Sequence, residues 1–229
     1  MPAELLEPRE AYALWAKDYP PRAHNPVMQA EQRAMLSLMP ADLRGHRVLD
    51  IACGSGRYML HALQRGAAHV SGVDLSPEML RRANDELRGF EDRMELMPGD
   101  LAALPLPDAC ADLTLCALAV GHLRELQPAL SELRRVTRPG GVLLCSDVHP
   151  VGHALGWLRD FKAGSGHYAV SHVPHPREEW LGACEELGLE IEGMLEPMLD
   201  RDDIPCDAHF DHKALELPVA LVFRLRRSC

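Results

Sequence analysis

Residues 47–74 carry the pattern that most restricts how this chain can fold. An apolar run, Val48-Leu49-Asp50-Ile51, leads into the glycine turn Ala52-Cys53-Gly54-Ser55-Gly56, then a helical pattern and a second apolar run that ends at Asp74. Two strands joined by a helix form a βαβ unit, and glycines in its first turn let a ligand approach the backbone closely. A carboxylate about 20 residues after the first glycine can accept hydrogen bonds from a ribose diol. The unit therefore predicts a nucleoside site.

The alternation of strands and helices continues along the chain. Strands are expected at Arg47–Ile51, His69–Val73, Met94–Met97, Asp112–Ala117, Val142–Ser146, Leu189–Leu195 and Val219–Leu225. Helices are expected at Arg57–Arg65, Pro77–Leu87, Glu125–Val136 and Arg177–Leu187. Pro139-Gly140-Gly141 is expected to end the third of these helices before the fifth strand begins. A chain of 229 residues in this order predicts one α/β domain, a mostly parallel sheet with helices on both faces.

Two segments stand outside this alternation. Residues 1–46 carry two helical patterns, Pro8–Lys17 and Asn25–Met39, and we expect them to form a lid over a domain at 47–229. Residues 147–176 show no clear periodicity and hold five histidines together with Trp157, Phe161 and Tyr168. Such a stretch inside a compact domain is typical of a functional insertion, so we expect it to cap a substrate pocket.

Composition and charge exclude several classes of function. Hydrophobic residues make up 47% of the chain and the formal net charge is −10, so a globular protein is expected and a phosphate backbone would be repelled. No run is long enough to span a bilayer, and the N-terminus has no basic-then-apolar leader. Seven cysteines without a CxxC pair indicate neither a disulfide framework nor a zinc site. We therefore expect a cytoplasmic protein that acts on neither nucleic acid nor membrane.

Two residues near the glycine turn argue against a dinucleotide. The dinucleotide fingerprint has a third glycine three residues after the second, and this chain has Met59 there. Asp50 lies just before the turn, where a carboxylate repels a pyrophosphate but suits a ligand with an ammonium and a sulfonium group. An NAD(P)-dependent oxidoreductase is the weaker alternative.

Four motifs in order resemble those of the class I S-adenosylmethionine-dependent methyltransferases. They are the segment 48–56, Gly72-Val73-Asp74-Leu75-Ser76, Gly99-Asp100, and the segment 133–141 before the fifth strand. The resemblance covers nearly the whole chain and lies with the small-molecule enzymes, in the ubiquinone/menaquinone and malonyl-carrier group. It implies a Rossmann-like, seven-stranded sheet with an antiparallel last strand, an N-terminal helical lid, a cap after strand 5, and S-adenosyl-L-methionine as cofactor.

The resemblance also implies which residues hold the cofactor. Gly54 and Gly56 would admit its methionine part, Asp74 its ribose, and Asp100 with the Leu101 backbone its adenine. Asp100 has an alternative reading as a solvated loop acid. The full expected set is Tyr19, Asp50, Ala52, Cys53, Gly54, Gly56, Asp74, Leu75, Met79, Gly99, Asp100, Leu101 and Leu118.

The N-terminal aromatic residues Tyr12, Trp15 and Tyr19 have two readings. They either close over the cofactor and exclude water, with Tyr19 the preferred contact, or anchor their helix to the sheet.

Histidines are the candidates for acid–base chemistry. His122 follows the fourth strand, where similar enzymes face the transferable methyl group, and it either handles the substrate or caps the next helix. His149 and His172 are the further candidates for a general base. No Asn/Asp-Pro-Pro-Tyr pattern accompanies His122, which disfavours methylation of nucleobases. His149 and His153 have metal-ligand spacing, but no third ligand lies nearby, so no metal is expected.

The sequence leaves the acceptor open. A small, partly apolar or aromatic molecule is expected, while oxygen, nitrogen and carbon acceptors are not distinguished and the oligomeric state is not readable. A catalytically silent cofactor-binding subunit that regulates a partner is the alternative from another class of function.

Overall fold

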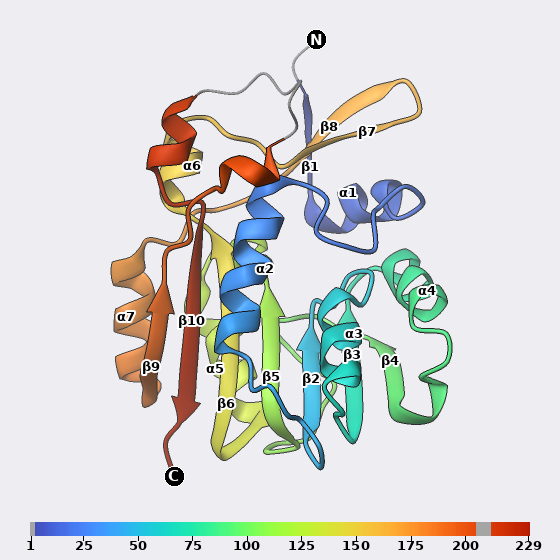
Figure 1. Ribbon diagram of the computed structural model, residues 1–229, viewed down its shortest axis with the longest axis vertical. Coiled ribbons are helices and arrows are strands. Elements are labelled where there is room, and N and C mark those ends of the chain that lie inside the picture. The colour runs from blue at the N-terminus through green and yellow to red at the C-terminus, as the bar shows by residue number, and fades with distance from the viewer. Residues whose placement is uncertain (1–2, 205–211) are drawn as a thin grey trace.

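The computed structural model describes residues 3–204 and 212–229. Its body is a seven-stranded sheet in the order β4-β3-β2-β5-β6-β10-β9 (Figure 1). The strands are β2 (Arg47–Ile51), β3 (His69–Asp74), β4 (Met94–Pro98), β5 (Ala111–Ala117), β6 (Thr137–Val148), β9 (Leu189–Leu195) and β10 (Ala220–Arg227). The strand β10 runs antiparallel to both of its neighbours, β6 and β9, whereas β2 to β6 pair in parallel. The expected Rossmann-like sheet with an antiparallel last strand is confirmed.

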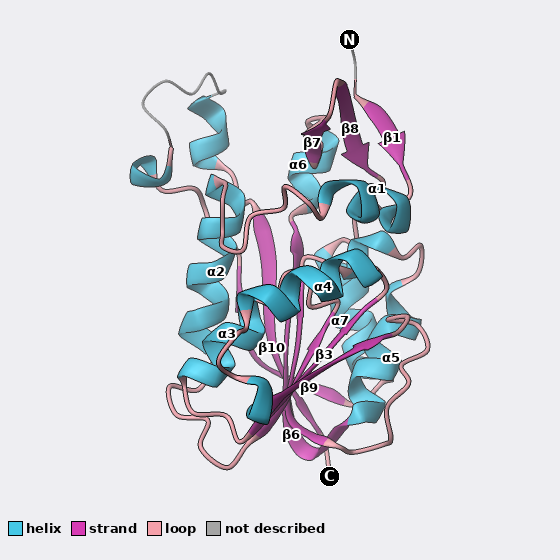
Figure 2. Cartoon of the chain, turned by 90° about the vertical axis from the view of Figure 1, so that its right-hand side faces the viewer, coloured by secondary structure: helices cyan, strands magenta, loops and turns pink. Residues whose placement is uncertain are grey.

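Helices cover both faces of this sheet (Figure 2). The first apolar core contains residues of α2 (Pro26–Leu38) and α3 (Arg57–Gln64), and Leu80 of α4 (Pro77–Glu86) packs against it. The second core contains residues of α5 (Leu126–Val136) and α7 (Arg177–Glu186). Val48 belongs to the first core and its neighbour Leu49 to the second, because successive side chains of a strand point to opposite faces. Among the described residues, the order also includes four short 3-10 helices: η1 (Glu91–Arg93), η2 (Val120–His122), η3 (Arg201–Asp203) and η4 (His212–Glu216).

The strand β6 begins earlier than the sequence predicts. The expected start was Val142, but the strand already pairs with β5 at Thr137, directly after α5 ends. Pro139-Gly140-Gly141 therefore lies inside β6 and does not separate the helix from the strand, which corrects the prediction. The register shifts in this region and Gly140 has φ 72°, so a bulge accommodates these residues.

A second, three-stranded sheet lies above the carboxyl ends of the parallel strands (Figure 1). It has the order β1-β8-β7 and joins β1 (Glu4–Leu6) to the hairpin of β7 (Asp160–Ala163) and β8 (Gly166–Val170). The helices α1 (Pro8–Trp15) and α6 (Pro150–Ala154) lie in the same region. Trp15 of α1 stacks on Phe161 of β7 with ring centroids 4.6 Å apart. The N-terminal segment and the insertion at 147–176 thus form one cover.

The helix α2 does not belong to this cover, although it lies within the expected lid at 1–46. It packs along β10 and β6, and its Met35 is fully buried in the core of the large sheet. The division of the chain at residue 46 stays a prediction. Within residues 3–204 and 212–229, no helix has both the length and the apolar character that crossing a membrane requires.

Candidate active site

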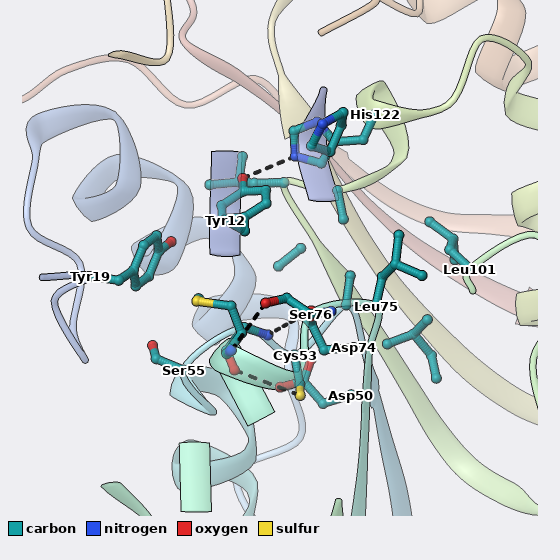
Figure 3. Close-up of a pocket in the computed structure, with 18 of the residues that line it drawn as sticks. Tyr12, Tyr19, Asp50, Cys53, Ser55, Asp74, Leu75, Ser76, Leu101 and His122 are labelled. Carbon is teal, nitrogen blue, oxygen red and sulfur yellow. Dashed lines mark hydrogen bonds between the residues drawn. The ribbon is translucent and has the colours of Figure 1, made fainter. Parts of the chain in front are cut away.

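A cavity of about 310 Å³ opens where the parallel strands end, beneath the cover. Its lining comes from the ends of β2, β3 and β5, the loop after β4, and parts of the cover (Figure 3). Carboxyl ends of parallel strands are where open α/β sheets bind ligands. The following expected cofactor residues line it: Tyr19, Asp50, Ala52, Cys53, Gly54, Asp74, Leu75, Met79, Gly99, Asp100, Leu101 and Leu118. The sequence pattern therefore located the cavity, while the roles of these residues stay predictions.

Gly56 is the exception, since it does not line the cavity. It is the N-cap of α3 with φ 81°, and a Cβ there would lie 3.0 Å from Cδ1 of Leu87. The need for glycine at this position thus comes from backbone conformation and from packing against the end of α4. Gly54 has φ 54° and faces Met79, whose Cε would lie 3.4 Å from a Cβ. Only at Gly54, therefore, can the need for glycine be explained by space for a ligand.

Asp50 caps the helix that follows the glycine turn. Its Oδ2 accepts a hydrogen bond of 3.1 Å from the backbone N–H of Met59, in the first turn of α3. Burial raises the pKa of Asp50 to about 7, although Arg57 opposes this. A helix N-terminus is the usual seat of a pyrophosphate, and here a carboxylate already holds it. The structure thus adds a physical reason against the dinucleotide alternative.

Asp74 is held firmly at the end of β3. Its Oδ2 accepts from the Gly54 N–H and its Oδ1 from the Ser76 N–H, both at 2.8 Å. Ser76, whose Oγ accepts from the Met79 N–H, provides the side-chain cap of α4, so Asp74 is not needed as the cap. A carboxylate has about four lone-pair sites, and the two backbone bonds leave others for a diol. The residue is therefore a preorganised acceptor, and burial raises its pKa.

The loop after β4 forms the other side of the cavity. Asp100 is exposed and its Oδ1 accepts a 2.8 Å bond from the Ala102 N–H, which fixes the turn. Gly99 is tightly packed, because a Cβ there would lie 2.6 Å from Val73 Cγ1. Leu75 leaves 44% of its surface exposed although it is apolar, which suits contact with a flat ring. These residues fit an adenine, the role that the resemblance implies.

The end of β5 carries a conformation that L-residues rarely adopt. Leu118 has φ 54°, like Ala52 at the end of the neighbouring strand β2 (φ 56°), and both line the cavity. The Leu118 N–H donates two hydrogen bonds that hold this conformation, one to the backbone carbonyl of Ser146 at 2.8 Å and one to Ser146 Oγ at 3.2 Å. Strained backbone held in this way is concentrated at ligand sites.

Arg159 is a site residue that sequence reasoning missed. It lies just before β7, and its Nη1 donates a 3.0 Å hydrogen bond to the Leu118 carbonyl. Its Nη2 donates to the Tyr19 hydroxyl at 3.3 Å, and its Cζ lies 5.4 Å from the centre of the Tyr12 ring. A single arginine in an aperiodic insertion carries no local signal, so only the folded cover brings it to the cavity.

His122 and Tyr12 meet at the cover side of the cavity (Figure 3). The Tyr12 hydroxyl and His122 Nε2 are 3.0 Å apart, and His122 Nδ1 lies 3.2 Å from the Ser171 carbonyl. A carbonyl only accepts, so the Nδ1–H donates to it and the neutral ring accepts from Tyr12 through Nε2. Burial lowers the pKa of His122 to about 4, with Arg159 the next cause. His122 is thus neutral near pH 7, and the lone pair on its Nε2 already accepts the hydrogen bond from the Tyr12 hydroxyl.

The other expected histidines lie outside the cavity lining. His149 is the N-cap of α6, where its Nδ1 accepts from the Val151 N–H at 3.2 Å. His172 lies behind His122 and pairs with buried Asp147 through a 3.0 Å contact. Neither position suits direct contact with a substrate, which departs from the expectation of further general bases.

The expected aromatic pocket is also different. Trp157, Phe161 and Tyr168 do not line the cavity: Phe161 of β7 stacks on Trp15, and Trp157 lies against Gly152 of α6. The aromatic lining comes instead from Tyr12, Tyr19 and Tyr58.

A buried acid fixes a second cation of the site, Arg57. Glu31 of α2 is fully buried and accepts from the Tyr58 hydroxyl at 2.9 Å, from Ser146 Oγ at 2.6 Å and from Arg57 Nη2 at 3.1 Å. Arg57 and Tyr58 line the cavity. Arg57 and Tyr58 directly follow the glycine turn, so the sequence could have predicted that they lie near the cavity. Their contact with Glu31 could not be predicted in this way, because it depends on how α2 packs.

No group of three or more histidine, cysteine or acidic side chains close enough to hold a metal occurs in the part of the chain that the structure describes. Burial raises the pKa of Cys53, the cysteine in the cavity lining, well above its ordinary value. Its thiol is therefore protonated near neutral pH and does not serve as a nucleophile.

Comparisons with known proteins agree with this geometry. A family model for the methyltransferase domain matches residues 49–145. The chain is 43% identical over 109 residues to malonyl-[acyl-carrier protein] O-methyltransferase of Pectobacterium atrosepticum, covering 48% of this chain and 41% of that protein. It is 36% identical over 154 residues to the ubiquinone/menaquinone biosynthesis C-methyltransferase UbiE of Methylobacterium nodulans, covering 64% and 58%. Over these segments the chain is similar to methyltransferases, as the four sequence motifs predict.

The methyltransferase fold extends beyond the matched segment. A crystal structure of an S-adenosylmethionine-dependent methyltransferase from Mesorhizobium loti superposes with a TM-score of 0.71 at 24% identity, covering 86% of this chain and 98% of that one. This likeness concerns the fold. The chain spans about half the length of the curated relatives it matches. The family resemblance expected from the four motifs is confirmed.

The residues of the cavity fit S-adenosylmethionine, the cofactor that the resemblance implies. S-adenosylmethionine carries a ribose diol, an ammonium and a sulfonium, and the cavity presents Asp74 and Asp50 among its lining acids. Both are held in place by backbone N–H groups, so they need no rearrangement to receive a cation or a hydroxyl. The positive φ angles at Ala52, Gly54 and Leu118 shape the backbone around the same space.

Proposed function

We propose that this chain transfers a methyl group from S-adenosyl-L-methionine to a small, partly apolar or aromatic molecule. The observation that carries the proposal is the Asp74 carboxylate, fixed by two backbone hydrogen bonds in a cavity that also holds Asp50 and the Tyr12–His122 pair. The bound cofactor supplies a methyl group already activated by its sulfonium.

The protein residues supply position and a dry environment. Asp74 would hold the ribose hydroxyls, Asp100 and the Leu101 backbone the adenine, and Asp50 the ammonium. Alignment of two reactants in one site is worth on the order of 7 kcal/mol or more of the barrier. The cover formed by α1, β1 and the β7–β8 hairpin excludes water from the same space.

Within this proposal Tyr12 and His122 orient the acceptor. A histidine with a pKa of about 4 is a weak general base near neutral pH, and its Nε2 is engaged by the Tyr12 hydroxyl. The pair instead presents a hydroxyl of fixed direction, whose oxygen can accept a hydrogen bond from an N–H or O–H of the methyl acceptor. This reading replaces the expectation of proton abstraction by His122, His149 or His172, and an acceptor that needs no strong base suits it best.

The proposal is tested by binding and by turnover. Calorimetry with S-adenosylhomocysteine measures binding, and a labelled methyl group measures transfer to a panel of small phenols, acids and amines. Wild-type protein that binds the nucleoside but transfers no methyl group across the panel would favour the alternative of a catalytically silent regulatory subunit. Failure to bind either the donor or its demethylated product at millimolar concentration would refute the proposal.

For His122→Ala we expect turnover to fall roughly 5- to 150-fold, because the hydrogen bond of about 1–3 kcal/mol that orients the Tyr12 hydroxyl is lost. The dissociation constant of S-adenosylhomocysteine should change less than about twofold. His46, which is half-buried just before β2 at the end of the strand opposite to the cavity, provides a matched control as His46→Ala. Unchanged turnover in His122→Ala would make His122 a structural residue.

A further inference from the structure

The guanidinium of Arg159 forms no close ion pair with an acid among the described residues. Its two hydrogen bonds go to neutral groups, the Leu118 carbonyl and the Tyr19 hydroxyl. Among the described residues, no carboxylate forms an ion pair with it within 4.0 Å. Asp147 acts on it from a longer distance, and one oxygen of Asp147 already contacts His172. A partly buried cation in this state gains stability when a ligand brings the opposite charge.

A second arginine of the same cavity provides the comparison. Arg57 also lines the cavity, but its Nη2 lies 3.1 Å from the fully buried carboxylate of Glu31. Arg57 is therefore already neutralised by the fold, whereas the charge of Arg159 faces the cavity without a partner. Arginine offers five N–H donors in a planar fork that matches both oxygens of a carboxylate. The hydrogen bonds of Arg159 to Leu118 and Tyr19 use two of these donors.

The strand order fixes where this charge lies along the cavity. Across the sheet the order is β4, β3, β2 and β5, so Asp100 comes first, then Asp74, then the glycine turn, and Leu118 last. Arg159 binds the Leu118 carbonyl and thus lies at the end opposite to Asp100. If Asp100 and Asp74 receive adenine and ribose, this end receives the methionine part of the cofactor and the acceptor.

We propose that Arg159, with the Tyr19 hydroxyl beside it, forms a carboxylate-binding subsite of the cavity. The inference rests on the proposed function, because the order of ligand parts comes from it. The carboxylate has two possible sources, the methionine part of the cofactor or an acid group of the acceptor. In both cases the cover contacts the ligand carboxylate through Arg159, since this residue belongs to the insertion that pairs with β1.

The test compares two nucleosides on wild-type protein and Arg159→Gln. S-adenosylhomocysteine contains the carboxylate, and 5′-methylthioadenosine keeps adenine and ribose but lacks the amino acid. If the carboxylate belongs to the cofactor, Arg159→Gln weakens binding of S-adenosylhomocysteine by roughly 10- to 100-fold and leaves that of methylthioadenosine unchanged. Lys162→Gln, which removes an exposed positive charge from β7, should bind both nucleosides as the wild type does.

A second arm tests the acceptor as the source. Benzoate and hexanoate, each beside its neutral amide, are titrated into protein saturated with S-adenosylhomocysteine, and the shift in melting temperature is measured. If the acceptor carries the carboxylate, the acids but not the amides stabilise the wild type, and Arg159→Gln loses this response.

The inference is overturned if Arg159→Gln matches the wild type in both arms, or if it weakens both nucleosides equally, which would indicate a structural role. Wild-type protein that binds neither nucleoside would refute the proposed function itself, so the two failures are distinguishable.

Discussion

The Asp74 carboxylate supports both the loop structure and the proposed binding of ribose, so its removal should be visible in two separate measurements. In Asp74→Ala the backbone N–H groups of Gly54 and Ser76 each lose an acceptor at 2.8 Å. Reasoning from the sequence predicts loss of cofactor binding with the fold intact. The structure adds that the turn between β2 and α3 and the start of α4 are both tied to this side chain.

The magnitudes follow from the hydrogen bonds. A bond to a charged group contributes about 1.5–3 kcal/mol when buried, but cavity water can replace part of it here. Burial also disfavours the ionised carboxylate, as its raised pKa indicates. We therefore expect the free energy of unfolding to fall by about 1–3 kcal/mol, or roughly 2–10 °C in melting temperature. Two lost bonds to a ribose diol would weaken S-adenosylhomocysteine by roughly 10²- to 10⁴-fold.

Calorimetry with S-adenosylhomocysteine and thermal melting without ligand measure the two effects on the same samples. Asp74→Asn keeps one oxygen acceptor and should fall between the wild type and the alanine variant in both assays. Asp112→Ala is the matched control, since Asp112 also accepts a backbone N–H, that of Arg47 at 2.7 Å, but at the start of the strands. It should lower the melting temperature and leave affinity unchanged.

An Asp74→Ala protein that binds S-adenosylhomocysteine within about threefold of the wild type would refute the ribose assignment. A variant with reduced affinity and an unchanged melting temperature would refute the role of Asp74 in fixing the loop.

Three further outcomes are expected. Burial raises the pKa of Asp50 to about 7, so the ionised fraction of its carboxyl increases between pH 6 and 7. Binding of an ammonium-bearing nucleoside should therefore strengthen roughly fivefold over this interval. Calorimetry on Asp50→Asn should show no such dependence on pH. The same raised pKa makes the ionised residue cost stability above pH 7, so Asp50→Asn should melt at a higher temperature than the wild type at pH 8, and a lower one would contradict this sign. Gly72→Ala should destabilise by about 1–3 kcal/mol in denaturant unfolding, because its Cβ would meet the Met59 side chain and lie 2.8 Å from Leu96 Cδ2; wild-type stability would show that this core has room.

Local pattern was enough to predict most strands of the large sheet and the residues at the floor of the cavity, whereas the antiparallel last strand was expected from the family resemblance. The strands β2 and β9 have the bounds that periodicity predicts, and the first turn of α4 begins at Pro77 after its Ser76 cap. Asp50, Gly54 and Asp74 were identifiable because a glycine turn and the residue that ends the next strand are fixed by the chain over a few tens of residues.

The sequence alone did not predict the cover or the contacts that it makes. The pairing of β1 with β8, the hydrogen bond between Tyr12 and His122, and the approach of Arg159 to Leu118 each join segments 40 or more residues apart. Short strands and single side chains leave no periodic signal, because their partners are chosen by packing of the whole chain and not by their neighbours. The sequence by itself thus determined the βαβ frame and its acids, whereas the tertiary structure decided which side chains of the cover face the cavity.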